Sequence, residues 1–206
     1  PDYLLLGQIL IEDGLLTNSQ FEELLAEYQA SNEIDDLNVA NEQNDMVEKL
    51  IHKFFHFDNS DMSGKIVAYL NLLFNDIVRF IGKDFTPLNP LMKSEYMTNY
   101  CVTQKDEGLL SFNSGIDMSK SVAIAFASRY AKEEFHEFDE YVKASIEDFL
   151  NLHNGLFNVN MSNEFSLELN LCPPEVHEEE TLTNATKIYV FPIIFPFGTI
   201  HFLMEI

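Results

Sequence analysis

The hydrophobic residues of this chain recur at two different intervals, and the change of interval limits the folds that it can adopt. Over residues 65–81 and 139–157, apolar side chains follow the helical period of an amphipathic helix. Short apolar or alternating stretches, which are typical of β-strands, occupy residues 100–103, 109–112, 165–171, 188–194 and 199–204. The segment 122–127 fits either an alternating strand or the start of a helix. The whole pattern predicts an α+β fold, in which two long helices pack on a mainly antiparallel sheet.

The length and composition allow a medium-sized domain with a small module joined to it. The chain has 206 residues, and 46% of them are hydrophobic, which suffices for a sizeable core. Residues 1–30 predict a small helical N-terminal module, with Thr17 or Asn18 as a helix N-cap. Residues 31–45 are polar, acidic and rich in Asn, so they predict a linker. Residues 46–206 are then expected to form the α+β domain.

The charge of the chain argues against two classes of partner. The sequence carries 34 Asp and Glu residues against 12 Lys and Arg residues, which is a net charge of −22. Nucleic acids and anionic membrane surfaces are bound by clustered Lys and Arg side chains. We therefore expect no nucleic-acid partner and no membrane partner.

The most apolar stretch of the sequence does not resemble a membrane span. Residues 188–206 are interrupted by Pro192, Pro196 and Gly198, so they predict two strands joined by a turn. No cationic segment precedes an apolar one at the start of the sequence, so no signal peptide is expected. These features indicate a cytoplasmic protein.

The cysteine and histidine residues do not form a metal-binding pattern. Cys101 and Cys172 are far apart in the sequence, and we expect both to be reduced thiols. His52 and His56 have the spacing of two zinc ligands on a helix, but no third ligand lies near them. His153 falls among apolar residues of the second long helix, which predicts a hydrogen-bonded core histidine. No metal site is expected in this chain.

Four residues share the polar side of the helix predicted at 139–157. The opposite side carries the apolar stripe, which comprises Val142, Ile146, Phe149, Leu150, His153 and Leu156. At 100° per residue, Ala144, Asp148, Asn151 and Gly155 fall within an arc of roughly 60°. A carboxylate and a carboxamide are thus expected side by side in solvent, with small residues one turn away on either side. The simplest interpretation is a solvated helix face that ends in an Asn-Gly cap; the alternative is a recognition face.

The residues around this helix resemble the CheC, CheX and FliY family of chemotaxis phosphatases. Members of that family carry an ExxN pair on a long helix, with a glycine four residues after the Asn. Residues 148–155 read DFLNLHNG, so Asp148, Asn151 and Gly155 take these positions. Residues 165–176 resemble the family strand that ends in Ser-Pro-Pro, and residues 195–202 resemble its closing hairpin.

The likeness begins near residue 66, is strongest to CheX, and implies a function. Family members hydrolyse the aspartyl phosphate of a CheY-like receiver domain in chemotaxis or two-component signalling. The resemblance implies that Asp148 binds the active-site lysine of the receiver and that Asn151 holds the attacking water in line with the P–O bond. Ala144 and Gly155 would let the partner approach the helix closely. Mg²⁺ is expected on the receiver, and no cofactor is expected in this chain. Family members often dimerise, so a homodimer is also expected.

Two departures from the family pattern lead to an alternative. The family Glu is replaced by Asp148, whose side chain is one methylene shorter, and Glu147 points roughly 100° away around the helix. The first long helix contains Asn71, Asn75 and Asp76, but these residues do not make a second ExxN motif. The alternative is a catalytically weak or inactive module that binds a receiver or another protein.

The N-terminal residues resemble a different family. Residues 6–29 are similar to the N-terminal domain of type II secretion and pilus ATPases, some relatives of which bind cyclic di-GMP through an arginine. Leu5 takes the position of that arginine, and no Lys or Arg precedes Lys49. A doubly charged nucleotide would therefore find no counter-charge. We interpret this unit as a docking or packing module and exclude nucleotide binding.

Overall fold

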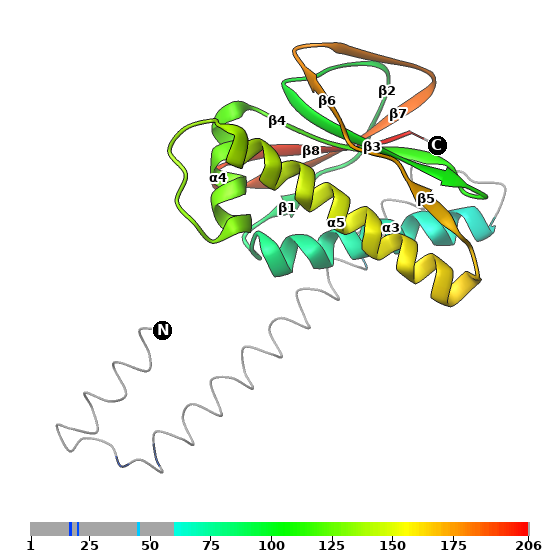
Figure 1. Cartoon of the computed structure of the whole chain (residues 1–206), viewed down its shortest axis with the longest axis horizontal. Helices are drawn as coiled ribbons and strands as arrows, with labels where there is room; N and C mark the ends of the chain where they lie inside the picture. Colours follow the sequence, from blue (N-terminus) through cyan, green and yellow to red (C-terminus); the bar gives the residue numbers. More distant parts are fainter. Residues whose placement is uncertain (1–16, 18–19, 21–44, 46–59, 206) are drawn as a thin grey trace. The chain divides into compact units, whose positions relative to one another are not determined.

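The computed structural model describes residues 17, 20, 45 and 60–205 (Figure 1). The chain divides into two compact units, Pro1–Asp45 and Met46–Ile206. In the first unit, Gln20 is helical and its backbone N–H donates to Thr17 Oγ1 at 3.3 Å. The Gln20 side chain accepts a hydrogen bond from the Thr17 backbone N–H at 2.9 Å. This reciprocal pair is a capping box, and it supports Thr17 as the N-cap. Asp45, the last residue of the predicted linker, is helical. The rest of the predicted module, the remainder of the linker and the His52/His56 segment lie outside the described residues.

The described part of the second unit contains three helices and eight strands. The helices are α3 (Ser60–Phe80), α4 (Lys120–Ala131) and α5 (Glu140–Phe165). The strands are β1 (Thr86–Pro87), β2 (Leu91–Met97), β3 (Tyr100–Gly108), β4 (Phe112–Met118), β5 (Leu169–Leu171), β6 (Glu175–Glu178), β7 (Thr181–Phe195) and β8 (Gly198–Glu205).

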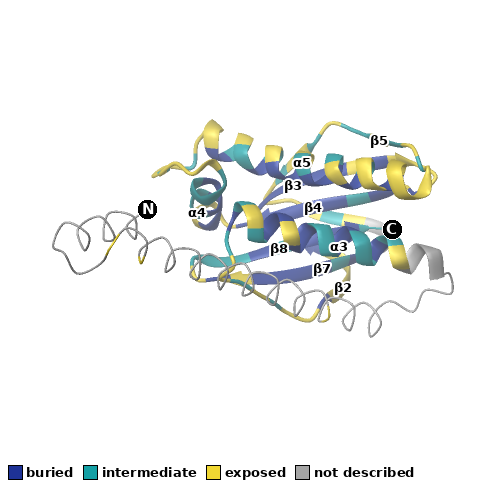
Figure 2. Cartoon of the chain, turned by 90° about the horizontal axis from the view of Figure 1, so that it is seen from below, coloured by how far each residue is buried: buried dark blue, intermediate teal, exposed yellow. Residues whose placement is uncertain are grey.

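The strands form one antiparallel sheet with the order β1-β7-β8-β4-β3-β5. In addition, β2 pairs with β7 and β6 pairs with β3. The long helices α3 and α5 lie side by side on one face of this sheet (Figures 1 and 2). The predicted α+β fold is therefore confirmed, with α4 as a third helix.

The inner faces of α3 and α5 pack against the sheet and form the main core. The buried residues of α5 are Val142, Ile146, Phe149, Leu150, His153, Asn154, Phe157 and Met161. Those of α3 include Ile66, Tyr69, Leu70, Leu73, Phe74 and Ile77. The predicted apolar stripe is thus confirmed at every position but one: Leu156, at its edge, is 37% exposed.

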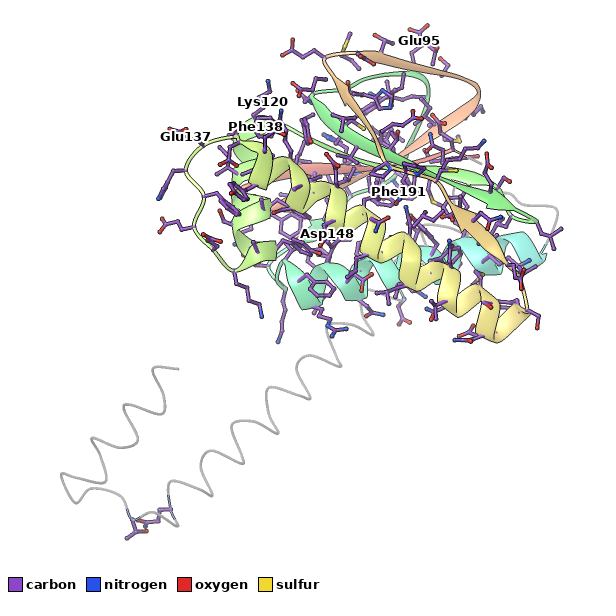
Figure 3. The ribbon with its side chains drawn as sticks, in the orientation of Figure 1. Glu95, Lys120, Glu137, Phe138, Asp148 and Phe191 are labelled. Atoms are coloured by element: carbon purple, nitrogen blue, oxygen red, sulfur yellow. The ribbon has the colours of Figure 1, made fainter. Side chains whose placement is uncertain are left out.

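The start of α5 is held by its N-cap and by the residue before it. Asp139 accepts hydrogen bonds from the backbone N–H groups of the first turn, at 3.1 and 3.0 Å. The ring of Phe138 packs edge-on against Tyr100 of β3, with 4.9 Å between centroids. Lys120 places its ammonium group over Phe138, at 5.5 Å from the ring centroid (Figure 3). Lys143 does the same at 5.6 Å.

The other end of α5 corrects the expected Asn-Gly cap. The helix continues through Gly155 for nearly three further turns and ends at Phe165. Ser166 adopts a left-handed conformation with φ 54°, and its N–H donates to carbonyl groups of the last turn. The helix continues because Phe157 and Met161 still find buried positions against the sheet.

Two predicted strands are wrong in extent. Residues 109–111 form the turn between β3 and β4, so that Leu109 is 83% exposed, and only Phe112 of the stretch 109–112 is in a strand. In the stretch 165–171, only Leu169–Leu171 is a strand, because α5 extends to Phe165.

The ambiguous segment 122–127 lies within helix α4, which is capped by Ser119. The apolar stretch 188–206 contributes to the β7–β8 hairpin, as predicted, with its turn at Pro196 and Phe197. None of the helices in the described part of the chain is long and apolar enough to cross a membrane.

Candidate functional site

The structure brings the four predicted site residues together on the outer face of α5. Ala144, Asp148 and Asn151 are exposed, and Gly155 is half-buried. Asp148 lies on α5 (Figure 3). A Cβ atom at Gly155 would meet no other atom within 4 Å, so the backbone there is open to a partner. We refer to these four residues as the α5 outer face.

Exposed apolar side chains accompany the α5 outer face along the helix. Tyr141 is 73% exposed, and Val159 is also exposed. At 100° per residue both lie within roughly 20° of Asp148 around the helix axis. A carboxylate and an amide between two exposed apolar residues form a surface suited to a protein partner.

The carboxylate of Asp148 already accepts a hydrogen bond within the chain. The hydroxyl of Tyr130, near the end of α4, donates to Asp148 Oδ2 at 2.6 Å. Burial and this hydrogen bond raise the pKa of Tyr130, so the hydroxyl keeps its proton. Tyr130 therefore orients Asp148 but also competes with any donor from a partner.

The carboxamide of Asn151 is also held from inside the chain. Its Oδ1 accepts a hydrogen bond from Nε2 of Gln104, a buried residue of β3, at 2.9 Å. No described residue accepts a hydrogen bond from Asn151 Nδ2. The NH₂ group of this exposed side chain is therefore available to a partner.

Gln104 is held in turn by two further contacts. Its Nε2 also donates to the carbonyl oxygen of Cys172 at 2.9 Å, and its Oε1 accepts from Nδ2 of Asn154 at 3.0 Å. Asn154 is buried, and its Oδ1 accepts a hydrogen bond from the hydroxyl of Tyr69 on α3. A chain of buried hydrogen bonds thus connects α3, α5 and β3 beneath Asn151.

Sequence reasoning did not identify Tyr130, Gln104 or Asn154 as neighbours of the site. Gln104 follows Val102 by two positions on β3, and residues two apart on a strand point to the same face. Because Val102 is buried in the core, this spacing places the polar side chain of Gln104 toward α5. That inward position was the available signal. No comparable signal marks Tyr130, because its contact with Asp148 depends on how α4 packs on α5.

His153 is a core residue, as predicted. Its Nδ1 lies 2.8 Å from Oδ2 of Asp76 on α3, and both side chains are buried. Burial lowers the pKa of His153, although Asp76 opposes that effect. This pair connects the two long helices and does not open onto the α5 outer face.

The cysteines and acidic residues provide no metal site in the described part of the chain. Within it, no group of three or more His, Cys, Asp or Glu residues is placed to hold a metal ion. Cys101 is buried, Cys172 is half-buried, and both are free thiols, as predicted. Burial raises the pKa of Cys101, which disfavours its thiolate.

Comparisons with known proteins give matches at the level of structure. No protein-family model matches the sequence, and no curated protein sequence matches it. A CheC-like superfamily protein from Shewanella sp. PV-4 matches with a TM-score of 0.59 and 16% identity, covering 71% of this chain and 97% of that chain. The chemotaxis protein CheX from Desulfovibrio desulfuricans matches with a TM-score of 0.57 and 13% identity, covering 69% and 98%.

A third structure is the CheX-CheY-BeF₃-Mg²⁺ complex from Borrelia burgdorferi. It matches with a TM-score of 0.57 and 18% identity, covering 68% of this chain and 96% of that chain. These identities are low, while nearly the whole length of each matched chain is covered. The chain therefore has the α+β fold of the CheX and CheC-like chemotaxis proteins.

Proposed function

We propose that this protein binds a phosphorylated, CheY-like receiver domain through the α5 outer face and accelerates hydrolysis of its aspartyl phosphate. The observation that carries the proposal is the exposed pair of Asp148 and Asn151, with open backbone at Gly155, on the long helix of a CheX-like fold. A protein of the same fold has been crystallised together with CheY, BeF₃ and Mg²⁺. That complex supports a receiver as the partner.

The proposed chemistry requires positioning more than covalent help. A water attacks the phosphorus atom, the bond from phosphorus to the aspartyl oxygen breaks, and the products are inorganic phosphate and the free carboxylate. Asn151 offers an NH₂ group as donor and the second lone pair of Oδ1 as acceptor, so its carboxamide can orient that water. Phosphoryl transfer is accelerated chiefly by such positioning and by electrostatic stabilisation. Mg²⁺ would be supplied on the receiver side.

Asp148 is proposed as the anchor for the receiver. Its carboxylate would accept a charge-assisted hydrogen bond from the active-site lysine of the receiver. To do so it must share or release the hydroxyl of Tyr130, which donates to it at 2.6 Å. Asp148 can therefore anchor the receiver only when the receiver lysine displaces the Tyr130 hydroxyl or shares the carboxylate with it.

The main test is phosphate release from a phosphorylated receiver in the presence of Mg²⁺. We expect Asn151→Ala to lower the rate constant by about tenfold or more, because the oriented amide is lost. Asn163→Ala is the matched control: it removes an exposed asparagine of the same helix about 18 Å further along its axis. Equal rates for Asn151→Ala and Asn163→Ala would reject the catalytic role of Asn151.

A second candidate function is receiver binding without efficient hydrolysis. Two observations favour it: the shorter acidic side chain at position 148 and its existing hydrogen bond to Tyr130. Asp148→Glu separates the candidates, because a longer anchor should raise the hydrolysis rate if reach alone limits it. A receiver that binds the wild type and Asp148→Glu equally, with no acceleration by either, would establish the binding module.

Three remaining proposals concern the setting of this activity: the compartment, the oligomeric state and the role of the N-terminal module. We expect the protein to act in the cytoplasm as a homodimer, with the N-terminal module as a docking or packing unit. Sedimentation of the full chain tests the dimer, and a mass equal to one chain at all concentrations would reject it.

A further inference from the structure

The sheet next to the α5 outer face contains an irregularity around two prolines. Strand β5 ends at Leu171, opposite Asp106 of β3, and β6 begins at Glu175, opposite Thr103. Residues 172–174 therefore lie opposite only two residues of β3. The backbone N–H of Cys172 still donates to β3, at 2.9 Å from Lys105 O, whereas Pro173 and Pro174 have no N–H to donate.

The carbonyl group that precedes the prolines determines how the Gln104 amide is oriented. The Cys172 carbonyl oxygen can only accept, so the group that faces it at 2.9 Å must be the NH₂ group of Gln104. The opposite orientation would place the Gln104 oxygen against the Cys172 oxygen. The Asn154 NH₂ group, which donates to Gln104 Oε1 at 3.0 Å, favours the same orientation.

The orientation of Gln104 in turn determines the orientation of Asn151. An NH₂ group has two hydrogens, and the second one of Gln104 is directed to Asn151 at 2.9 Å. The Asn151 atom that faces it must be an acceptor, which is Oδ1. The Asn151 NH₂ group is then the part of the carboxamide that faces outward.

The support beneath Gln104 is buried and well connected. The Asn154 carboxamide accepts a hydrogen bond from Tyr69 and donates one to Ser114 Oγ at 3.0 Å. Gln104, Asn154 and Ser114 are each no more than 1% exposed. A satisfied buried network of this kind rigidifies the side chains that it contains.

We propose that Gln104 is a positioning residue, which holds the carboxamide of Asn151 with its oxygen toward β3 and its NH₂ group toward a bound receiver. The inference rests on the proposed function for its effect on hydrolysis, but the orientation itself is a property of this chain alone. The Cys172-Pro-Pro segment contributes to this orientation, because the carbonyl group of Cys172 determines which end of the Gln104 amide faces Asn151.

Gln104→Met is the variant that tests this inference. It keeps the length of the side chain and removes the donor to Asn151. Gln104→Leu is the second variant, in case the first does not fold, because its side chain has no hydrogen-bond donor. Thr103→Val is the matched control: it removes a side-chain hydrogen bond of the neighbouring β3 residue, 3.0 Å from His177 Nε2, on the other face of the sheet.

The first readout is independent of any receiver. The side-chain NH₂ resonances of Asn151 in the ¹⁵N-labelled full chain are assigned by their loss in Asn151→Ala, and their order parameters are measured. We expect a rigid carboxamide in the wild type and in Thr103→Val, and a mobile one in the Gln104 variant. An equally rigid carboxamide in all three proteins would overturn the inference.

The second readout is the kinetics of receiver dephosphorylation. We expect the Gln104 variant to lower kcat by about 10- to 100-fold while KM changes by less than about twofold, since the binding surface is retained. A rise in KM with unchanged kcat would overturn the positioning role. If the wild type itself does not accelerate hydrolysis, the proposed function fails, and the NMR measurement alone decides whether Gln104 orients Asn151.

Discussion

At the scale of single residues, the two polar side chains of the α5 outer face differ in how the chain holds them. Asn151 is supported from a buried network through Gln104, at 2.9 Å. Asp148, which is exposed, accepts one hydrogen bond, from the hydroxyl of Tyr130 at 2.6 Å. A stronger donor can therefore replace the contact to Asp148 more easily than the contact to Asn151.

Removing the competing hydroxyl should therefore strengthen receiver binding. In Tyr130→Phe the carboxylate of Asp148 no longer shares its lone pairs, and we expect the affinity for a BeF₃-loaded receiver to rise by about two- to fivefold. Isothermal titration calorimetry measures the change. In an Asp148→Asn background the same substitution should have no effect, and an equal gain in both backgrounds would show that Tyr130 does not act through Asp148.

Asp106 and Asp117 are two buried carboxylates with contrasting surroundings. Asp106 accepts one hydrogen bond, from Asn158 at 2.7 Å, and its Oδ2 has no partner among the described residues. Burial raises the pKa of Asp106 to about 6, against an ordinary value of 3.8. Asp117 instead accepts hydrogen bonds from the Tyr96 hydroxyl and from two N–H groups of Asn99. Asp106 is thus costly in its charged form, whereas Asp117 has a hydrogen-bond donor at each of its carboxylate oxygens.

This contrast predicts opposite effects of the same substitution. The folded state binds more protons at Asp106 than the unfolded state between pH 4 and pH 6, so this residue lowers stability as the pH rises through that window. We expect Asp106→Asn to raise the free energy of unfolding by about 1–3 kcal/mol at pH 8, and by less at pH 5. Asp117→Asn should lower it by about 1–3 kcal/mol, because bound donors lose their acceptor.

Urea denaturation of both variants and the wild type at the two pH values makes this comparison. His153 also titrates differently in the folded state, since burial lowers its pKa, but it is present in all three proteins and cancels in the differences. A destabilised Asp106→Asn variant at pH 8 would contradict the prediction.

At the scale of elements, helix α5 shows what the sequence alone can and cannot predict. Its apolar stripe and its outer face follow from the 3.6-residue period, because a helix that packs on a sheet must bury one side continuously. Its C-terminal end could not be predicted. Asn154 and Gly155 resemble a cap locally, but Asn154 is buried and bonded to Gln104, and the chain still buries Phe157 and Met161 beyond it.

The partners of the site residues could not be predicted either. Gln104 lies 47 positions from Asn151 and Tyr130 lies 18 positions from Asp148, so both contacts depend on tertiary packing. The residues of the α5 outer face follow from periodicity alone. The residues that orient them follow only from the register of β3 and the packing of α4.

Gly155 offers a test in which stability and function should change in opposite directions. A Cβ atom would meet no atom within 4 Å, so Gly155→Ala should raise the free energy of unfolding by about 1 kcal/mol through helix propensity. The added methyl group should nevertheless weaken receiver binding by about three- to tenfold, because it occupies the line of close approach. Thermal unfolding and calorimetric titration of the same sample measure both effects.

The control for this substitution is Gly82→Ala. Gly82 has a φ of +141°, and a Cβ atom there would lie 2.8 Å from Asp84 Oδ1, so this variant should be destabilised. A Gly155→Ala protein that binds the receiver as tightly as the wild type would show that the partner does not approach α5 at this point.

At the scale of the whole molecule, the long helices within residues 60–205 lie on one face of the sheet. A smaller apolar cluster lies apart from the main core and consists of Tyr96, Cys101, Ile188, Val190 and Leu203. On α5 itself, Asp148 and Asn151 are exposed, whereas Phe149 on the opposite side is buried. A net charge of −22 over the chain favours partners that present positive charge, such as an active-site lysine.

The central claim, that the α5 outer face binds a phosphorylated receiver, is tested most directly by an NMR titration. The ¹⁵N-labelled full chain is titrated with a CheY-like receiver that carries BeF₃ and Mg²⁺. We expect the backbone signals of residues 144–155 to shift or broaden, those of β2 to stay unchanged, and the unmodified receiver to cause smaller changes. Changes confined to β2 or elsewhere on the sheet, with the signals of Asp148 and Asn151 unaffected at saturation, would contradict it.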